Sequence, residues 1–153
     1  MSARIDDSVV GTVQPTVEVD VERGRLRAFS HAIGETDPVY VDVDAARAAG
    51  HPDLPVPPTF LFGAGLGRGG DDFTWLTALG VDLRGVLHGS QRFTYHSVAH
   101  AGDSLRLTPQ IVDTYEKKGG TLRFLVRQTV VTRVDGSAVA DLEETIVVRE
   151  VGS

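Results

Sequence analysis

The spacing of apolar residues in the first third of the chain changes from that of a strand to that of a helix. Residues 17–21 alternate valine with acidic residues, which is typical of a short strand. Over residues 22–34 the apolar side chains instead fall on one face of a helix that a glycine ends. An Ala-rich run at 45–49 predicts a second short helix, with Asp42 or Asp44 as its N-cap.

The next segment is apolar on every side. Residues 57–66 begin with two prolines, which a first helical turn tolerates, and continue with apolar side chains and glycines. A helix without a polar face belongs in a core, so this one is expected to be buried. A mobile loop at 68–72 and one or two further helical turns at 73–79 are expected to follow.

The second half of the chain predicts long antiparallel strands. Alternating residues place them at 92–98, 104–115, 121–133 and 138–149, with turns at 101–103, 117–120 and 135–136. Within 121–133, one face is expected to carry Leu122, Phe124, Val126 and Val130, and the other a solvated set of arginines. The expected fold class is therefore α+β: a loose N-terminus at 1–14, then a single domain over 15–150. In that domain a central buried helix is wrapped by a curved antiparallel sheet, as in the hotdog fold.

Composition limits the possible functions. The 153 residues carry a formal net charge of −6, which argues against nucleic acid or an anionic membrane as a partner. Cysteine is absent, which removes disulfides, thiolate catalysis and zinc–thiolate sites. Apolar stretches are too short to span a bilayer, and the first residues contain no signal-peptide core. A cytoplasmic protein without metal or cofactor is expected.

Several motifs together resemble the MaoC-like dehydratases, specifically their N-terminal-domain type, also called fatty-acid-synthase-type dehydratase domains. The matching segments are Glu-Thr-Asp-Pro-Val-Tyr at 35–40, Val-Pro-Pro-Thr-Phe at 56–60, Leu-His-Gly at 87–89, Gln-Arg-Phe-Thr-Tyr-His at 91–96 and Tyr-Glu-Lys-Lys-Gly-Gly at 115–120. The resemblance covers roughly residues 15–150. It implies a hotdog domain that acts on acyl thioesters of coenzyme A or of acyl carrier protein.

The resemblance also implies a mechanism. Such enzymes add water to trans-2-enoyl thioesters, or run the reverse dehydration, with an Asp–His pair that holds and deprotonates the water. A carboxylate–imidazole pair supplies a base that works near neutral pH. A backbone N–H at the start of the central helix polarises the thioester carbonyl, because a helix N-terminus offers free donors to a developing negative charge.

Carried over by residue, the resemblance gives a degenerate site. Glu35 stands at the aspartate position, Asp37 at the asparagine position and Tyr40 at the histidine position. Thr59 replaces the glycine at the start of the helix but keeps a backbone N–H for the oxyanion. Tyrosine has an unperturbed pKa of about 10 and cannot collect a proton as imidazole does. Substrate binding is expected at Pro58, Thr59, Phe60 and His88.

Structural roles are alternatives for the same residues. Glu35 and Asp37 could shape a turn before Pro38, Tyr40 could be a core aromatic, and His88 could make a structural hydrogen bond. Of the other histidines, His31 and His51 are expected at the solvent edge.

Two further patterns point to no site. The spacing of His96 and His100 suits a metal only on a helix, and they fall on a strand end and a turn. The Gly-x-Gly-x-x-Gly match at 65–70 follows a helix, so no dinucleotide site is expected. A few arginines, such as Arg92 or Arg123, are candidates to meet coenzyme A phosphates.

Three functions remain open at this stage. The chain could be the acyl-chain-binding subunit of an (R)-specific enoyl-thioester hydratase or 3-hydroxyacyl-thioester dehydratase, paired with a catalytic MaoC-like hotdog chain. It could be a self-sufficient homo-oligomeric hydratase in which Glu35 and Tyr40 replace the usual pair. It could also be an acyl-CoA thioesterase or binding protein. In each case a homo- or heterodimer is expected.

Overall fold

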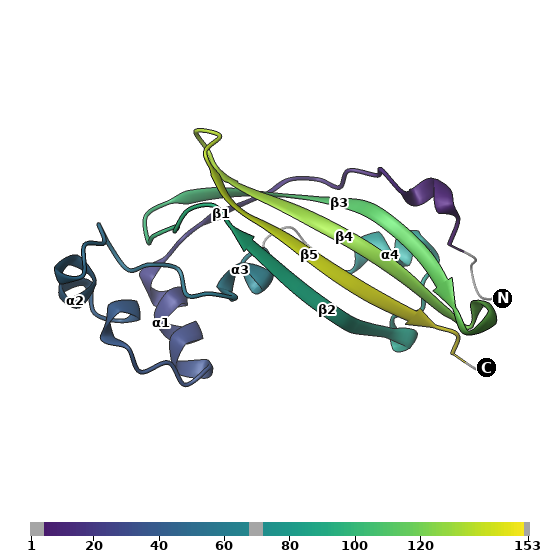
Figure 1. The fold of residues 1–153 in the computed structure, drawn as a ribbon, viewed down its shortest axis with the longest axis horizontal. Helices are drawn as coiled ribbons and strands as arrows, with labels where there is room; N and C mark the ends of the chain where they lie inside the picture. The colour runs from purple at the N-terminus through teal and green to yellow at the C-terminus, as the bar shows by residue number, and fades with distance from the viewer. Residues whose placement is uncertain (1–4, 68–71, 152–153) are drawn as a thin grey trace.

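A five-stranded antiparallel sheet forms most of the computed structural model, which describes residues 5–67 and 72–151. Its strands are β1 (Val17–Asp20), β2 (Val86–Tyr95), β3 (Ser104–Lys117), β4 (Leu122–Arg133) and β5 (Ala138–Arg149). They follow the order β1-β3-β4-β5-β2 (Figure 1). The expected meander is confirmed for β3, β4 and β5. β2 differs from it, because it pairs with β5 and forms an edge of the sheet.

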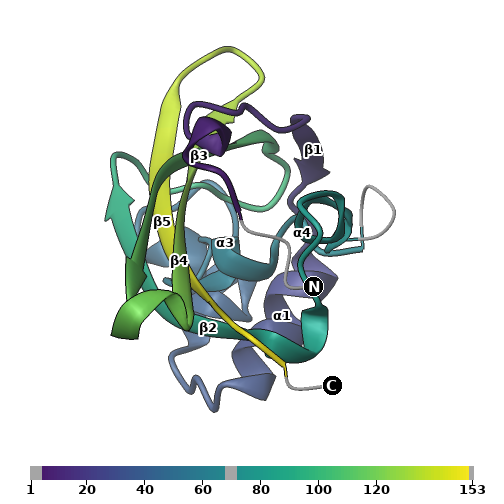
Figure 2. The same ribbon diagram turned by 90° about the vertical axis from the view of Figure 1, so that its right-hand side faces the viewer.

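The helices are short and occupy two regions. They are α1 (Arg23–Ala32), α2 (Val43–Ala48), α3 (Phe60–Gly63) and α4 (Thr74–Ala78), with 3-10 turns η1 (Asp7–Val9), η2 (Pro38–Tyr40), η3 (Leu83–Gly85) and η4 (Lys118–Gly120). In Figure 1, α1 and α2 extend beyond one end of the sheet, and in Figure 2, α3 and α4 lie to one side of it. Asp42 caps α2 as expected, accepting from the backbone N of Asp44 at 2.8 Å and of Ala45 at 3.3 Å. No helix in the described ranges is long and apolar enough to cross a membrane.

The central helix is much shorter than expected. α3 has four residues, and although Phe60 and Leu61 are buried, Phe62 is 48% exposed and Leu66 is 52% exposed. The prediction that this segment is covered on every side is therefore wrong. Glycines at 63, 65 and 67 explain the early end, since glycine is unfavourable inside a helix. Residues 68–71 lie outside the described residues. Most of the expected loop at 68–72 and the end of the glycine motif at 65–70 fall on them.

Two apolar clusters fill the concave side of the sheet. One joins α1, α3 and the segment before α3 to the strands, through Val19, Leu26, Leu54, Leu61, Leu105 and Val139 among others. The second lies under α4, where Leu76 packs with Ile111, Leu125 and Ile146 from three adjacent strands. This arrangement confirms the α+β class and the single hotdog domain, with a reduced central helix.

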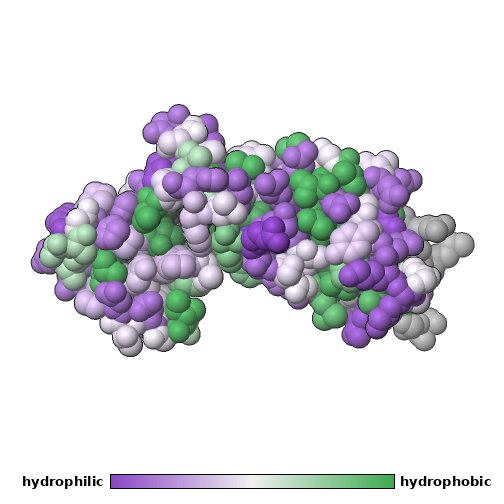
Figure 3. All heavy atoms as spheres, viewed as in Figure 1, coloured by the Kyte–Doolittle hydropathy of each residue, from purple (hydrophilic) through white to green (hydrophobic). Residues whose placement is uncertain are grey.

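The inner face of β4 is the opposite of the one predicted. Leu125 and Val131 are fully buried, whereas Val130 is 43% exposed. Leu122, Phe124, Val126 and Val130 therefore face outward, where Phe124 stacks on Tyr115 with ring centroids 4.8 Å apart. The inner set of alternate residues carries Arg123, Arg127 and Arg133 beside Leu125 and Val131, so the polarity pattern indicated the wrong face. Figure 3 shows separate apolar patches between polar side chains on the sheet.

The arginines of β4 are paired rather than solvated. Arg127 Nε lies 2.6 Å from Glu144 Oε1, and both side chains are mostly buried. Arg133 Nε lies 3.1 Å from Asp103 Oδ2. Arg123 contacts Asp7 and donates from Nη1 to Glu116 Oε1 at 2.7 Å, which commits the guanidinium to carboxylates.

The start of the described chain lies along β3. Gly11 N donates to Ile111 O at 2.8 Å, and Gln14 N donates to Pro109 O at 2.8 Å. Ile5 is buried in the cluster under α4. Parts of the segment before residue 15 therefore pack against the domain, and the expected boundary between 1–14 and 15–150 stays a prediction.

The two faces of β4 can be distinguished with one pair of substitutions. Val131→Ala removes a fully buried side chain and is expected to lower the free energy of unfolding by about 2–3 kcal/mol. Val130→Ala, on the neighbouring residue, is expected to cost less than about 1 kcal/mol. Urea denaturation of both variants measures the difference, and equal losses would contradict the assigned faces.

Candidate functional site

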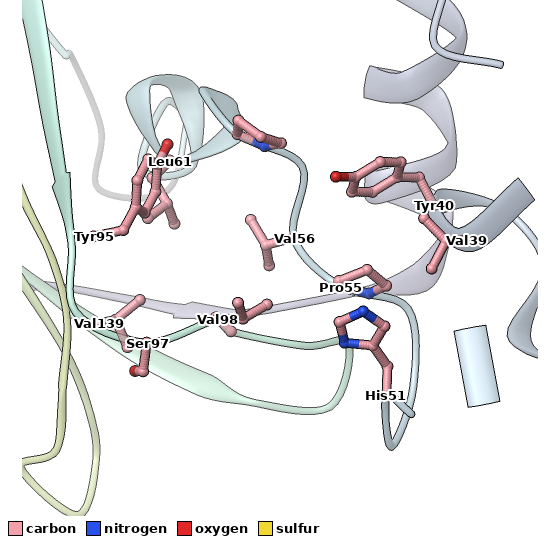
Figure 4. Close-up of a pocket in the computed structure, with 12 residues that line it drawn as sticks. Val39, Tyr40, His51, Pro55, Val56, Leu61, Tyr95, Ser97, Val98 and Val139 are labelled. Atoms are coloured by element: carbon pink, nitrogen blue, oxygen red, sulfur yellow. The ribbon is translucent and has the colours of Figure 1, made fainter. Parts of the chain in front are cut away.

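A cavity of about 330 Å³ opens between the end of β2, the start of α3 and the turn η2. Its lining is mostly apolar: Val39, Tyr40, His51, Pro55, Val56, Pro58, Leu61, Tyr95, Ser97, Val98, Ala99 and Val139. In Figure 4, Tyr95 and Tyr40 stand on opposite sides, with Val56 between them and Val98 below. Ligand pockets of this size with few polar groups are typical of sites for apolar molecules.

Two extended segments form a wall of this cavity by pairing with each other. Val56 N donates to Ala99 O at 2.8 Å, and Ala101 N donates to Leu54 O at 2.9 Å. Asp53, just before this ladder, forms an ion pair with Arg23 at the start of α1, with 2.5 Å between Oδ2 and Nη2. The hydrogen bond from Arg23 holds the pKa of the Asp53 carboxyl at about 2, with a further contribution from the Leu54 N–H. α1 is thereby tied to the cavity wall.

The acidic loop before η2 uses its carboxylates on its own backbone. Glu35 Oε1 accepts from Thr36 N at 2.8 Å and from Asp37 N at 2.9 Å. Asp37 Oδ1 accepts from Val39 N at 3.0 Å and so caps η2. Neither carboxylate lines the cavity. The turn-forming alternative describes these contacts, and Tyr40 is the member of the expected trio that reaches the cavity.

Thr59 has a left-handed backbone conformation, which is typical of glycine. Its φ of 74° is left-handed, which a threonine adopts only at a cost. Its backbone N–H, the expected oxyanion donor, is already in use: it donates to the hydroxyl oxygen of Tyr95 at 2.9 Å. Sequence reasoning missed Tyr95. Alternation places it on the same face as Phe93, but its contact with Thr59 spans 36 residues and has no local signal.

A histidine pair lies at the edge of the cavity. His51 Nδ1 and His100 Nε2 are 3.0 Å apart, so one ring nitrogen donates and the other accepts. Burial lowers the pKa of His100, and the neighbouring His51 lowers it further. His51 was expected at the solvent edge but lines the cavity. The described residues contain no cluster of three or more metal-ligating side chains.

The residues predicted to bind substrate do not all line the same cavity. Thr59 and Phe60 line a second hollow of about 280 Å³ together with Arg25, Ala28, Phe29, Phe62 and Gly63. His88 lines neither cavity: its ring contacts Phe62, and its Nε2 lies 3.1 Å from Gln91 Oε1. Pro58 is the predicted binding residue that lines the first cavity. Among the described lining residues of that cavity, the polar groups are two phenols, one imidazole and one serine hydroxyl.

Comparisons with known proteins place the chain in a family. A family model described as "FAS1-like, dehydratase domain region" matches residues 8–142. This chain belongs to the FAS1-like dehydratase family. A UPF0336 protein of Saccharopolyspora erythraea is 34% identical to it over 146 residues, which cover 95% of this chain and 92% of that protein. Another, from Streptomyces griseus, is 43% identical over 108 residues, covering 70% and 71% of the two chains.

Solved structures similar to this FAS1-like dehydratase chain share its fold. The HadBC complex of Mycobacterium tuberculosis, described as a 3R-hydroxyacyl-ACP dehydratase, is 26% identical with a TM-score of 0.77, covering 94% of this chain and 99% of that one. The ChsH1–ChsH2 complex of the same organism has a TM-score of 0.75 at 23% identity, covering 96% and 89%. A MaoC-like dehydratase has a TM-score of 0.79 at 20% identity, covering 93% and 42%. The MaoC-like resemblance is thus confirmed, and the function is of the hydratase/dehydratase type.

The backbone at Thr59 generates a stability prediction for this family member. Thr59→Gly is expected to raise the free energy of unfolding by about 0.5–1 kcal/mol, because relief of the left-handed conformation exceeds the added entropy of the unfolded chain. Thr36→Gly, at a loop residue without a positive φ, is expected to lower it by about 0.4–1 kcal/mol. Chemical denaturation gives both values, and a loss at Thr59 equal to that at Thr36 would exclude strain there.

Proposed function

We propose that this chain is the acyl-chain-binding subunit of an (R)-specific enoyl-thioester hydratase or 3-hydroxyacyl-thioester dehydratase. A second hotdog chain supplies the aspartate and histidine that activate water. The thioester is carried by coenzyme A or by acyl carrier protein, and a cytoplasmic location belongs to the same proposal. The observation that carries it is an apolar cavity without a carboxylate among its described lining residues, in a member of a dehydratase family.

The chemistry of the cavity supports binding more than catalysis. Removing a proton from water beside an activated alkene needs a base whose pKa is near neutral pH. General acid–base catalysis of this kind accelerates a reaction by roughly 10²–10⁴-fold. The carboxylates of Glu35 and Asp37 accept backbone N–H groups in their own loop, and Tyr40 offers a phenol where imidazole would serve. An apolar wall of valines, prolines and Leu61 instead favours a hydrocarbon chain.

The exposed sheet edge supports a partner chain. β2 is ten residues long, and among the described strands it pairs with β5 alone, so its other edge offers backbone donors and acceptors to another strand. The cavity lies at the end of this strand, where Tyr95 forms part of its lining. A partner paired along β2 would therefore lie next to the cavity. HadBC and ChsH1–ChsH2, whose folds are similar to that of this chain, are both described as complexes.

A self-sufficient hydratase is the second candidate. The observation that favours it is the Tyr40 side chain, which lines the cavity and makes no hydrogen bond to a described residue. In that case Glu35 would turn from its loop to orient water, and the Tyr40 phenol would donate a hydrogen bond. In both candidate functions, the Thr59 N–H or a group hydrogen-bonded to it would contact the thioester oxygen.

The purified chain is expected to bind acyl-CoA without converting it. Affinity measured by calorimetry should rise about 4-fold for each methylene added to the acyl chain until the cavity is full, since each buried methylene contributes about 0.8 kcal/mol. With crotonyl-CoA and longer enoyl-CoAs, absorbance of the conjugated thioester should stay constant. It should fall when a MaoC-like hotdog chain with an intact aspartate and histidine is added.

Variants of the acidic loop separate the alternatives. Turnover by the chain alone that disappears in Glu35→Gln and in Tyr40→Phe would establish the self-sufficient enzyme and contradict the subunit proposal. Release of the free coenzyme A thiol would establish a thioesterase. Affinity that does not depend on chain length would contradict acyl binding in the cavity.

A further inference from the structure

The hydroxyl of Tyr95 stands between the cavity and the backbone donor at the start of α3. Thr59 N donates to Tyr95 Oη at 2.9 Å, which uses the oxygen as an acceptor and leaves the hydroxyl proton free to be donated. The described residues offer no acceptor for that proton. Tyr95 lines the first cavity, whereas Thr59 lines the neighbouring one. In Figure 4 the phenol oxygen points toward α3 along the upper side of the cavity.

The ring that carries this hydroxyl is held in position. Phe93, two residues earlier on β2, stacks on Tyr95 with ring centroids 5.9 Å apart and an interplanar angle of 3°. The hydrogen bond from Thr59 fixes the other end of the ring. Nonetheless the side chain is 48% exposed, so a ligand can approach it. A rigid, accessible phenol with an uncommitted proton is a suitable contact for a ligand oxygen.

The conformation of Thr59 serves the same contact. A left-handed residue at the start of α3 directs its N–H toward β2, and the helix gains no side-chain cap there. Non-glycine residues held in this conformation are found preferentially at ligand sites. Because the N–H already donates to Tyr95, a ligand carbonyl in the first cavity cannot use that donor unless the phenol moves away. Tyr95 is the group through which this donor reaches the cavity.

We propose that the Tyr95 hydroxyl is the donor that meets the carbonyl oxygen of a thioester in this cavity, and that the Thr59 N–H orients it. The Thr59 N–H thus acts indirectly: it donates to the Tyr95 oxygen, and the Tyr95 O–H donates to the ligand oxygen. Accepting a hydrogen bond strengthens the phenol as a donor. Burial raises the pKa of Tyr95 above its usual value, so the phenol keeps its proton at neutral pH. This inference rests on the proposed function, because it requires a thioester in the cavity.

Two ligands that differ only in the carbonyl test the contact. Octanoyl-CoA and its thioether analogue S-octyl-CoA have the same chain, and only the first carries a thioester oxygen. The wild-type chain is expected to bind octanoyl-CoA about 3- to 10-fold more tightly, as one added hydrogen bond implies. Tyr95→Phe is expected to remove this preference and leave S-octyl-CoA binding within about 2-fold of wild type. Calorimetry gives all four constants.

Tyr115→Phe is the matched control. It removes the hydroxyl of another tyrosine that stacks on a phenylalanine of the sheet, and Tyr115 lines neither cavity. It should keep the full preference for octanoyl-CoA. A Tyr95→Phe chain that binds octanoyl-CoA more tightly than wild type would overturn the proposal, because the phenol would then block the Thr59 donor instead of extending it. Equal binding of both ligands by the wild type would overturn it as well.

An experiment without ligand separates this inference from the proposed function. Hydrogen exchange followed by NMR should show the Thr59 amide protected in the wild type and in Tyr115→Phe, and exchanging at least about 5-fold faster in Tyr95→Phe. Failure of both CoA ligands to bind the wild type would contradict the proposed function. Binding without any carbonyl preference, or an unchanged Thr59 amide, would contradict only the role of Tyr95.

Discussion

The short antiparallel ladder between residues 54–56 and 99–101 is the constraint on which the site depends. Its hydrogen bonds, Val56 N to Ala99 O and Ala101 N to Leu54 O, hold the proline-rich segment against the chain that leaves β2. Both partners of this ladder line the cavity, through Pro55 and Val56 on one side and through Ala99 on the other. The ladder places the start of α3 beside the end of β2, where Thr59 N donates to Tyr95 Oη at 2.9 Å.

Local features could be predicted from the sequence because their causes are local. The Asp42 cap of α2, the helical face of α1 and the hairpins between β3, β4 and β5 each depend on residues a few positions apart. The family resemblance supplied the hotdog fold and the dehydratase type. It also pointed to Thr59, Pro58 and Tyr40, which do lie at the two cavities.

Features that join distant residues could not be predicted in the same way. The position of β2 beside β5 depends on pairs from 45 residues apart (Tyr95 with Ala140) to 62 residues apart (Val86 with Val148). The buried face of β4 was predicted wrongly because it carries three arginines, whose carboxylate partners lie on other elements. The pairing of Arg127 with Glu144 is set by adjacent strands and not by either strand alone. Tyr95 was missed for this reason, since only the folded chain brings its hydroxyl to Thr59.

Under the proposed function, the cavity binds a thioester without supplying a carboxylate–imidazole pair, since no carboxylate is among its described lining residues. The carboxylates of Glu35 and Asp37 stabilise the loop that presents Tyr40, and the first cavity is left with apolar walls, two phenols, one imidazole and one serine hydroxyl. In that proposal, the cavity holds and aligns the acyl chain while a partner paired along β2 activates water. The left-handed backbone at Thr59 is of the kind found preferentially at ligand sites.

Locating the acyl chain of a bound ligand tests this account most directly. With methyl-labelled valine and deuterated protein, NMR can detect contacts between the methylenes of bound octanoyl-CoA and individual valine methyl groups. The account predicts contacts to Val56, Val98 and Val139 in the cavity, and none to Val130 on the outer face of the sheet. Contacts confined to Val130 and its neighbours on the outer face would contradict it.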